Sequence, residues 1–220
     1  MITPSDFAYN ETKDLLKGKK KIQEPFDELL TWISAKYDVK TINVFYDFVI
    51  PDHRPRLQVI LEKRNDYLFF KEKGSFNFKK EIQEEISEKF IEIINRDNYN
   101  NFEINSLFTV FSDFESIAIA EANTKITERE IETLLSEIND KELWKIERCF
   151  ATTVLFYYTL KQKEKSLLEL KNKLYTLKYF DLIKKYDEFG FLNKDTFSIL
   201  FDCKENFDKN FNGNWFNYWR

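Results

Sequence analysis

The spacing of hydrophobic residues along the chain predicts several helices. Apolar positions recur at helical spacing in residues 25–37, where Pro25 suits the first helical position, and again in residues 79–95. A third helix is expected after Thr127-Glu-Arg-Glu130, a capping-box pattern in which a hydroxyl and a carboxylate satisfy two free backbone amides. Two more apolar faces run through residues 141–188, and their spacing leaves open whether they belong to one long helix or to two.

Alternating and β-branched stretches predict the strands. Residues 41–50 are rich in β-branched and aromatic side chains, and a loop with two prolines separates them from the alternating positions that follow Leu57. We therefore expect an antiparallel hairpin. Further strands are expected at residues 67–70, as a pair within residues 107–121, at residues 196–201 and at residues 215–219. Strands near both ends with helices between them predict an α+β fold, in which a mostly antiparallel sheet packs against several helices and the second half holds one or two long helical segments.

The chain shows no boundary between domains. No segment rich in proline, glycine or serine interrupts it, and no repeat with a period of 20–50 residues is visible. We therefore expect residues 1–220 to form a single domain, with a polar N-terminal segment over residues 1–22. The basic run Lys17-Gly-Lys-Lys-Lys21 within this segment is expected to be a solvated turn.

Composition limits the partners and the compartment. The chain has 38 acidic and 34 basic side chains, a net charge of −4, and thus lacks the basic excess that gives affinity for phosphate backbones. We do not expect nucleic acid as the main partner. The longest weakly charged apolar run, residues 149–160, has about half of the roughly 20 residues that a membrane span needs. With no signal-peptide pattern at its start, the chain is expected to be soluble and cytoplasmic, without a membrane partner.

Candidate catalytic residues are few. The single histidine, His53, lies in the loop of the predicted hairpin without a partner motif, and the four scattered glycines form no phosphate-binding loop. Asp113 and Glu115 would point to the same side of an extended strand, where they could bind a divalent cation or act as acid and base. The pattern is more typical of an acidic turn between strands. We expect no cofactor and no metal, and keep a small carboxylate-dependent hydrolase, with or without a divalent metal, as an alternative.

The two cysteines, Cys149 and Cys203, lie among apolar neighbours and are expected to be buried side chains in a reducing compartment. The sequence leaves open whether they pair.

Aromatic residues are the most distinctive feature of the composition. The chain has 4 Trp, 11 Tyr and 23 Phe, enough to fill a core and also to form a recognition surface. If residues 215–219 are extended, Trp215 and Trp219 lie on one side, and Phe216 and Tyr218 on the other. One aromatic set then needs a second surface to cover it. The pattern leaves open whether that surface belongs to the same molecule or to a partner.

The stretches Asp202-Cys-Lys-Glu-Asn-Phe-Asp208 and Gly213-Asn-Trp-Phe-Asn-Tyr-Trp219, with the size and mild acidity of the chain, resemble bacterial immunity proteins that neutralise polymorphic or contact-dependent toxins. The resemblance implies a non-enzymatic inhibitor whose acidic and aromatic surface masks a cognate toxin. On that hypothesis the partner is another protein. The candidate partner-binding residues are Tyr99, Asn101, Asp113, Glu115, Trp215, Tyr218 and Trp219. A structural subunit that assembles through its aromatic tail is the second alternative, and the sequence leaves the oligomeric state open.

Overall fold

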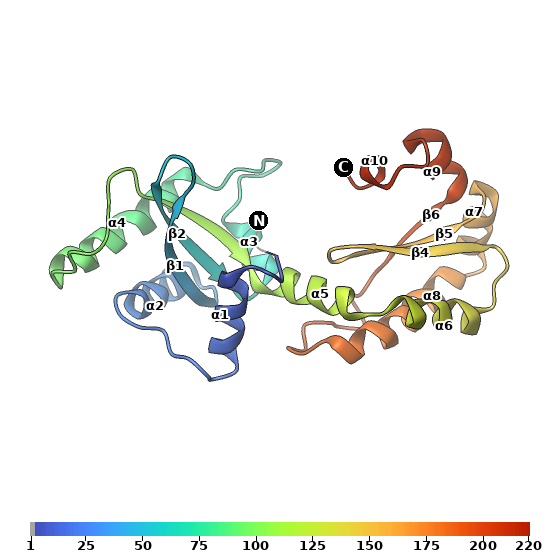
Figure 1. Cartoon of the computed structure of the whole chain (residues 1–220), viewed down its shortest axis with the longest axis horizontal. Helices are drawn as coiled ribbons and strands as arrows, with labels where there is room; N and C mark the ends of the chain where they lie inside the picture. Colours follow the sequence, from blue (N-terminus) through green and yellow to red (C-terminus); the bar gives the residue numbers. More distant parts are fainter. Residues whose placement is uncertain (1–2) are drawn as a thin grey trace. The chain divides into compact units, whose positions relative to one another are not determined.

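The computed structural model describes residues 3–220 and divides the chain into two compact units, Met1–Ile117 and Ala118–Arg220 (Figure 1). The α+β class is confirmed, with 48% helix and 19% strand. The sequence predicted one domain with one sheet, whereas the structure contains two small mixed sheets, each with its own hydrophobic core. The division falls within helix α5 (Phe114–Lys125).

Unit 1 is a three-stranded sheet with helices on both faces. Its elements before α5 are α1 (Phe7–Leu16), α2 (Phe26–Tyr37), β1 (Thr41–Val49), β2 (Arg54–Leu61), α3 (Arg64–Phe69), α4 (Lys80–Arg96) and β3 (Phe108–Asp113). The strand order is β1-β2-β3; β1 and β2 are antiparallel, and β2 and β3 are parallel. Helices α2 and α4 cover one face, where Ile33 and Phe90 join Val44 and Val59 in the core. Helix α1 lies against the other face, because Thr12 accepts a hydrogen bond from Asn43, the strand neighbour of Val44.

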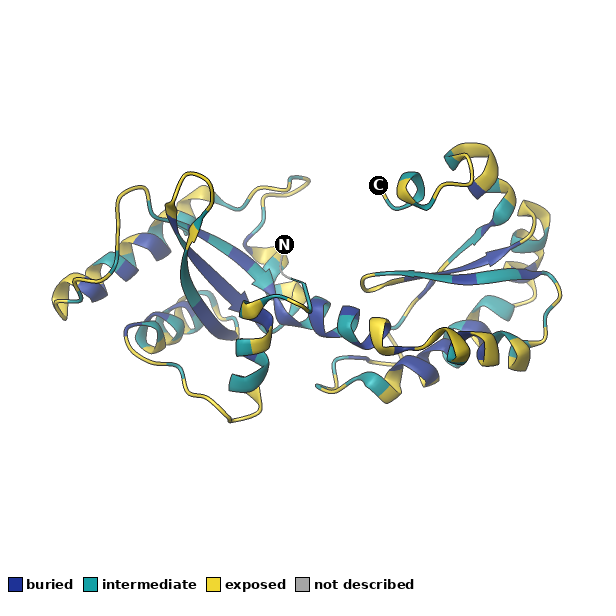
Figure 2. Cartoon of the chain, in the orientation of Figure 1, coloured by how far each residue is buried: buried dark blue, intermediate teal, exposed yellow. Residues whose placement is uncertain are grey.

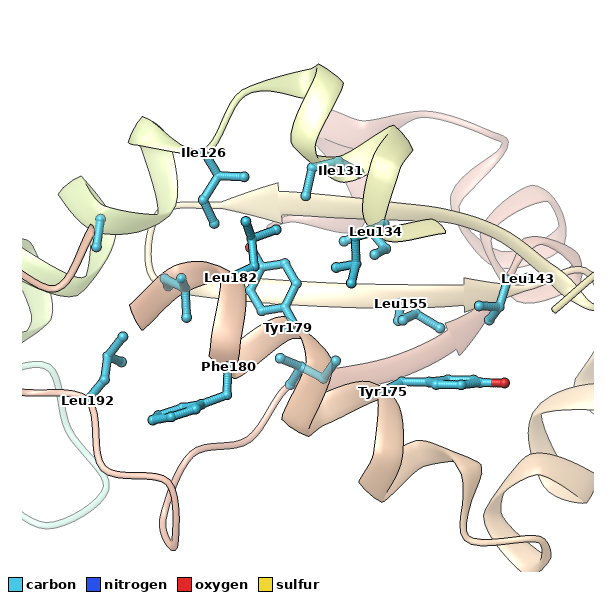
Figure 3. Packing of buried hydrophobic residues seen from close by; sticks show 14 of the residues in the cluster. Ile126, Ile131, Leu134, Leu143, Leu155, Tyr175, Tyr179, Phe180, Leu182 and Leu192 are labelled. Atoms are coloured by element: carbon cyan, nitrogen blue, oxygen red, sulfur yellow. The ribbon is translucent and has the colours of Figure 1, made fainter. Parts of the chain in front are cut away.

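Unit 2 has the same architecture. Its elements after α5 are α6 (Glu128–Ile138), β4 (Leu143–Cys149), β5 (Thr152–Tyr157), α7 (Leu160–Leu168), α8 (Lys171–Ile183), the 3-10 helix η1 (Lys184–Tyr186), β6 (Leu200–Cys203), α9 (Lys204–Phe211) and α10 (Trp215–Tyr218). Helices α6 and α8 pack on one face, where Leu134, Tyr179 and Leu155 meet in the core (Figure 3). On the other face, Phe207 of α9 packs against Val154 and Phe156 of β5.

The two units repeat one order of elements: a helix, an antiparallel hairpin, two helices, a strand parallel to the second strand of the hairpin, and a helix. The details agree as well. Leu61 pairs with Asp113 in unit 1, and Tyr157 pairs with Cys203 in unit 2, in each case at the point where a helix follows the last strand directly. Both hairpins also have a bulge near the start of the first strand. The chain is therefore a structural duplication at a spacing of about 100 residues, judged from the first strands of the two hairpins, Thr41 and Leu143.

Several elements are confirmed as predicted. Helices α2, α4 and α6 and the first hairpin occupy the expected residues, and the capping box forms: the Thr127 hydroxyl accepts from the Glu130 amide, and the Glu130 carboxylate accepts from the Thr127 amide. Exposed residues lie mainly in loops and on outward helix faces, and buried residues follow the strands (Figure 2).

Other predictions were wrong, and most errors concern strands. Residues 67–70 lie at the end of α3 rather than in a strand, and the predicted strand pair within residues 107–121 is one strand followed by α5. Residues 143–157 form the hairpin β4–β5, so the helices expected over residues 141–188 begin only at Leu160, as α7 and α8. Five of the six residues of β5 are buried, so this strand is apolar on both sides and lacks the alternation that identifies a half-buried strand.

The chain ends also differ from the prediction. Residues 215–219 do not form a strand, because the Asn214 side chain accepts a hydrogen bond from the amide of Phe216 at 2.8 Å and caps the short helix α10. The strand expected at residues 196–201 begins only at Leu200. The N-terminal segment contains α1, whose Tyr9 and Thr12 are fully buried.

Candidate protein-interaction surface

The two predicted acidic residues cap helices. Asp113 is 6% exposed, and its carboxylate accepts a hydrogen bond from the Ser116 amide at 2.7 Å at the start of α5. Glu115 accepts a hydrogen bond from the Arg64 amide at 3.0 Å at the start of α3. Carboxylates in these positions accept hydrogen bonds from backbone amides that have no partner within the helix.

Unit 2 repeats both caps with partly different residues. The Cys203 sulfur accepts from the Asn206 amide at 3.4 Å, and Glu205 accepts from the Leu160 amide at 3.1 Å. Glu205 thus performs for α7 what Glu115 performs for α3. The repetition gives Glu115 a structural role at the start of α3, one that the same residue type has in both units.

The predicted loop at residues 99–101 has one packed and one exposed residue. The Tyr99 ring packs edge to face against Phe102 with centroids 6.3 Å apart, and its amide donates to the Ile94 carbonyl at 2.9 Å. Asn101 is exposed and lines a cavity beside β1. This loop precedes β3, whereas Asp113 is the last residue of β3, so the strand separates these two predicted sites.

The predicted aromatic residues of the tail cover the outer face of the second sheet. Trp215 stacks on Phe207 with ring centroids 4.0 Å apart, and Trp219 packs partly buried beside Tyr218. The Tyr218 hydroxyl donates to Asp202 at 2.8 Å; burial and this hydrogen bond to a carboxylate both raise the pKa of the Tyr218 phenol. The tail therefore finds its second surface in the same unit.

The structure also shows a cluster of exposed leucines that the sequence patterns did not single out. Helices α7 and α8 meet at Leu170, and four leucines around this junction are between 52% and 84% exposed. We call them the leucine corner: Leu167, Leu168, Leu170 and Leu174. Exposed apolar side chains are common singly, but four within eight residues form the kind of patch that marks an interaction site.

Hydrogen bonds between buried and partly buried side chains hold the leucine corner in place. Asn172, in the first turn of α8, accepts from the Ser166 hydroxyl of α7 at 2.6 Å and from the Tyr157 hydroxyl of β5 at 2.8 Å. Ser166 and Tyr157 are fully buried. The corner is therefore presented on a fixed frame that connects both helices to the sheet.

Charged side chains lie beside the leucine corner. Asp140 accepts from the Tyr175 hydroxyl at 2.7 Å and from Lys171 at 3.3 Å. Burial opposes its ionisation, but these bonds and one from the Glu142 amide outweigh it and lower the pKa of the Asp140 carboxyl. Lys171 also pairs with Glu169 at 3.1 Å. The patch thus has an ionised rim of mixed sign.

The backbone at the corner is strained. Leu170 has φ 57° and ψ 15°, a left-handed conformation that suits glycine or asparagine, and its side chain is 71% exposed. Packing inside the unit does not explain a leucine here, since most of the side chain faces solvent. Residues kept in such conformations often serve recognition. The corresponding connection in unit 1, between α3 and α4, also exposes apolar side chains: Leu68, Phe69 and Phe76.

The sequence shows the helical spacing of these leucines but not their exposure. The spacing of Leu167, Leu170, Leu174 and Leu177 predicts one apolar helical face within residues 141–188, in one helix or in the second of two. Because the helix breaks at Leu170, these side chains separate from the core, where Tyr175 and Tyr179 take their place. No spacing rule predicts a left-handed leucine.

The remaining candidate residues offer no assembled chemistry. Cys149 and Cys203 are free thiols, and burial raises the pKa of each. His53 is an exposed loop residue. Within residues 3–220, no group of three or more His, Cys, Asp and Glu side chains is arranged to hold a metal ion.

Comparison with protein-family models, with curated proteins and with solved structures gave no match to this chain. Across residues 3–220, none of the helices combines the length and the apolar character that crossing a membrane requires.

Proposed function

We propose that this chain is a non-enzymatic protein-binding module of the immunity type, which binds and neutralises a cognate toxin through the leucine corner. The observation that carries the proposal is the set of four exposed leucines on a frame fixed by partly buried hydrogen bonds, with Leu170 in a strained conformation. In the isolated chain these leucines leave their apolar surface in water. A partner that covers the leucines would bury that surface.

The magnitude fits an anchor rather than a complete interface. Burying the exposed parts of four leucines is worth on the order of 4–8 kcal/mol, while association itself costs roughly 4–15 kcal/mol. Contacts around the corner must therefore add to the affinity. The mixed charges of Glu169 and Lys171, and the net charge of −4 on the chain, can contribute there by favouring a basic partner during encounter.

The hydrolase alternative gains no support from the carboxylates that suggested it. Asp113 and Glu115 each accept a hydrogen bond from a backbone amide at the start of a helix, and Glu115 has a counterpart in Glu205. The alternative of a structural subunit loses its proposed contact, since the aromatic tail packs within unit 2.

The test is capture of partners from native lysate by the tagged chain and by two leucine variants, with mass spectrometry of bound proteins at low and high salt. Leu168→Glu places a charge in the corner at a side chain that is 84% exposed. Leu200→Glu is the matched control, at a 56% exposed leucine of the same unit outside the corner. We expect one stoichiometric partner with the wild type and the control, and at least tenfold less with Leu168→Glu.

The captured partner is then expressed alone and together with the chain. Growth arrest by the partner that co-expression relieves, and that Leu168→Glu fails to relieve, supports the immunity role. A partner that is harmless when expressed alone contradicts it. Equal capture by both variants contradicts the leucine corner as the contact.

A further inference from the structure

Unit 1 contains a groove that runs along the edge of its sheet. The cavity has a volume of about 700 Å³, within the range of ligand-binding sites. Four consecutive residues of β1, Asn43 to Tyr46, line it. Successive side chains of a strand point to opposite faces, so a cavity that touches all four lies beside the strand, not above one face.

The course of the chain explains the groove. Helix α1 lies on one face of the sheet and α2 on the other, and β1 is an edge strand. The segment that connects the two helices, residues 17–25, must therefore cross the edge of β1, and residues 20–23 form the opposite wall of the cavity. Unit 2 has no such crossing segment before its hairpin, because α6 follows α5 after two residues.

The strand edge in this groove is open at the backbone of Tyr46. The Val44 amide donates to the Asn43 side chain at 2.9 Å, so it points away from β2. Residues two apart in a strand direct their backbone groups to the same side, so the amide and carbonyl of Tyr46 also point away from β2. Within residues 3–220, no hydrogen bond outside the β1–β2 pairing reaches the Tyr46 backbone, and residues 20–24 make no backbone hydrogen bond to β1.

Among residues 3–220, the wall opposite β1 carries one unpaired positive charge, at Lys21, beside an ion pair between Lys20 and Glu11, which also lines the cavity. Lys20 pairs with Glu11 at 2.5 Å, while Lys21 is exposed, lines the groove and has no ion pair among the described residues. Both belong to the run Lys17-Gly-Lys-Lys-Lys21, which was expected to be a solvated turn and is exposed as such. Its position beside an open strand edge gives this run a second property: it complements a negatively charged occupant.

We propose that the groove binds an extended, acidic segment of a partner protein, which adds to β1 as a fourth strand of the first sheet. Main-chain hydrogen bonds to the edge at Tyr46 supply affinity, and Lys21 selects acidic side chains. This site lies in unit 1 and is independent of the leucine corner in unit 2, so either proposal can fail without the other.

The experiment uses a displayed library of random decapeptides, selected against the full chain, with affinities of the enriched peptides measured by calorimetry. We expect enriched peptides to contain acidic residues and to lose at least tenfold in affinity when a central residue is replaced by proline. On binding, the amide of Tyr46 should become protected from hydrogen exchange.

Variants locate the site. Asn101→Trp and Gln23→Trp replace exposed lining residues and fill the groove, and each should weaken binding at least tenfold; Asn105→Trp, in the same loop but outside the lining, should not. Lys21→Glu should weaken binding likewise, and the exposed Lys73→Glu should have no effect. Circular dichroism checks that each variant folds. Two filling variants are used, so that the test still holds if one of them does not fold.

Other outcomes overturn the proposal. Selection that yields no binding peptide, or peptides that tolerate proline at every position, contradicts strand addition. Peptides that bind equally to Asn101→Trp and Gln23→Trp occupy a different site. A concentration-dependent dimer that Gln23→Trp abolishes would show that the occupant is a second copy of the chain.

Discussion

The packing of the aromatic tail leads to a sharp prediction for Trp215→Ala. The Trp215 ring stacks on Phe207 at 4.0 Å and also contacts Phe156 and Trp144, with centroids 5.5 and 6.1 Å away. Its neighbour Phe216 is 67% exposed and lies outside this cluster. The two substitutions remove large aromatic rings from adjacent positions, so Phe216→Ala is a matched control.

The expected magnitudes follow from burial. A fully buried aromatic ring loses about 3–5 kcal/mol on truncation to alanine. Trp215 is only partly buried, which lowers this figure, but the substitution removes aromatic contacts with Phe207, Phe156, Trp144 and Tyr218. Such contacts are worth about 0.5–1.5 kcal/mol each in favourable geometry. We expect the free energy of unfolding to fall by about 3 kcal/mol for Trp215→Ala. For Phe216→Ala we expect a change of about 0.5 kcal/mol or less.

The assay is urea unfolding followed by far-ultraviolet circular dichroism, which does not depend on the fluorophore removed. The slope of the free energy against urea concentration should stay constant, which would show that only stability has changed. Equal effects of the two substitutions would refute the docked tail. Residues 215–219 would then be available to a partner, as the sequence pattern allowed.

Two further predictions test the helix caps and the buried tyrosines. Glu115→Ala and Glu205→Ala should each lower the free energy of unfolding by about 1 kcal/mol, because each removes an equivalent carboxylate cap. The control Glu72→Ala, at an exposed residue, should leave the free energy of unfolding unchanged. A large difference between Glu115→Ala and Glu205→Ala would contradict the duplicated role. Burial raises the pKa of Tyr179 to about 12, above the value of about 10 expected in the unfolded chain, so its contribution to stability is complete below pH 10 and is lost as the pH rises from about 10 to 12. Urea unfolding across that window should show that the free energy of unfolding falls less steeply with pH in Tyr179→Phe than in the wild type, by up to about 1.4 kcal/mol per pH unit, and identical slopes would refute the prediction.

The sequence predicted those elements that are half exposed. Helix α4 alternates buried positions such as Ile86 and Phe90 with a charged face, so its period is visible. The first hairpin and the capping box at Thr127 were equally clear, because turn residues and caps have local chemical causes. In these cases the physical reason for the structure lies within a few residues of sequence.

The sequence pattern did not identify elements that are buried on both sides. Strand β5 has no polar face, and β3 passes into α5 at Asp113 without a turn residue to mark the change. The structural roles of the two candidate acidic residues were hidden for a related reason. Asp113 and Glu115 were selected as charged residues with no visible structural role. The role of Asp113 depends on a helix that starts directly after a strand, and the role of Glu115 depends on a helix start at Arg64 that is distant in sequence.

The duplication was also hidden, because the two units conserve positions rather than residue types. The helix cap provided by Asp113 in one unit is provided by Cys203 in the other, whereas the second cap is a glutamate in both units, Glu115 and Glu205. Differences between two copies of one architecture are informative, since the fold cannot explain them. Unit 1 alone has a segment that crosses its sheet edge and leaves a groove there. Unit 2 alone breaks a helix at a left-handed leucine. These two departures from the shared plan are the features that the fold leaves unexplained, and the two proposed binding surfaces rest on them.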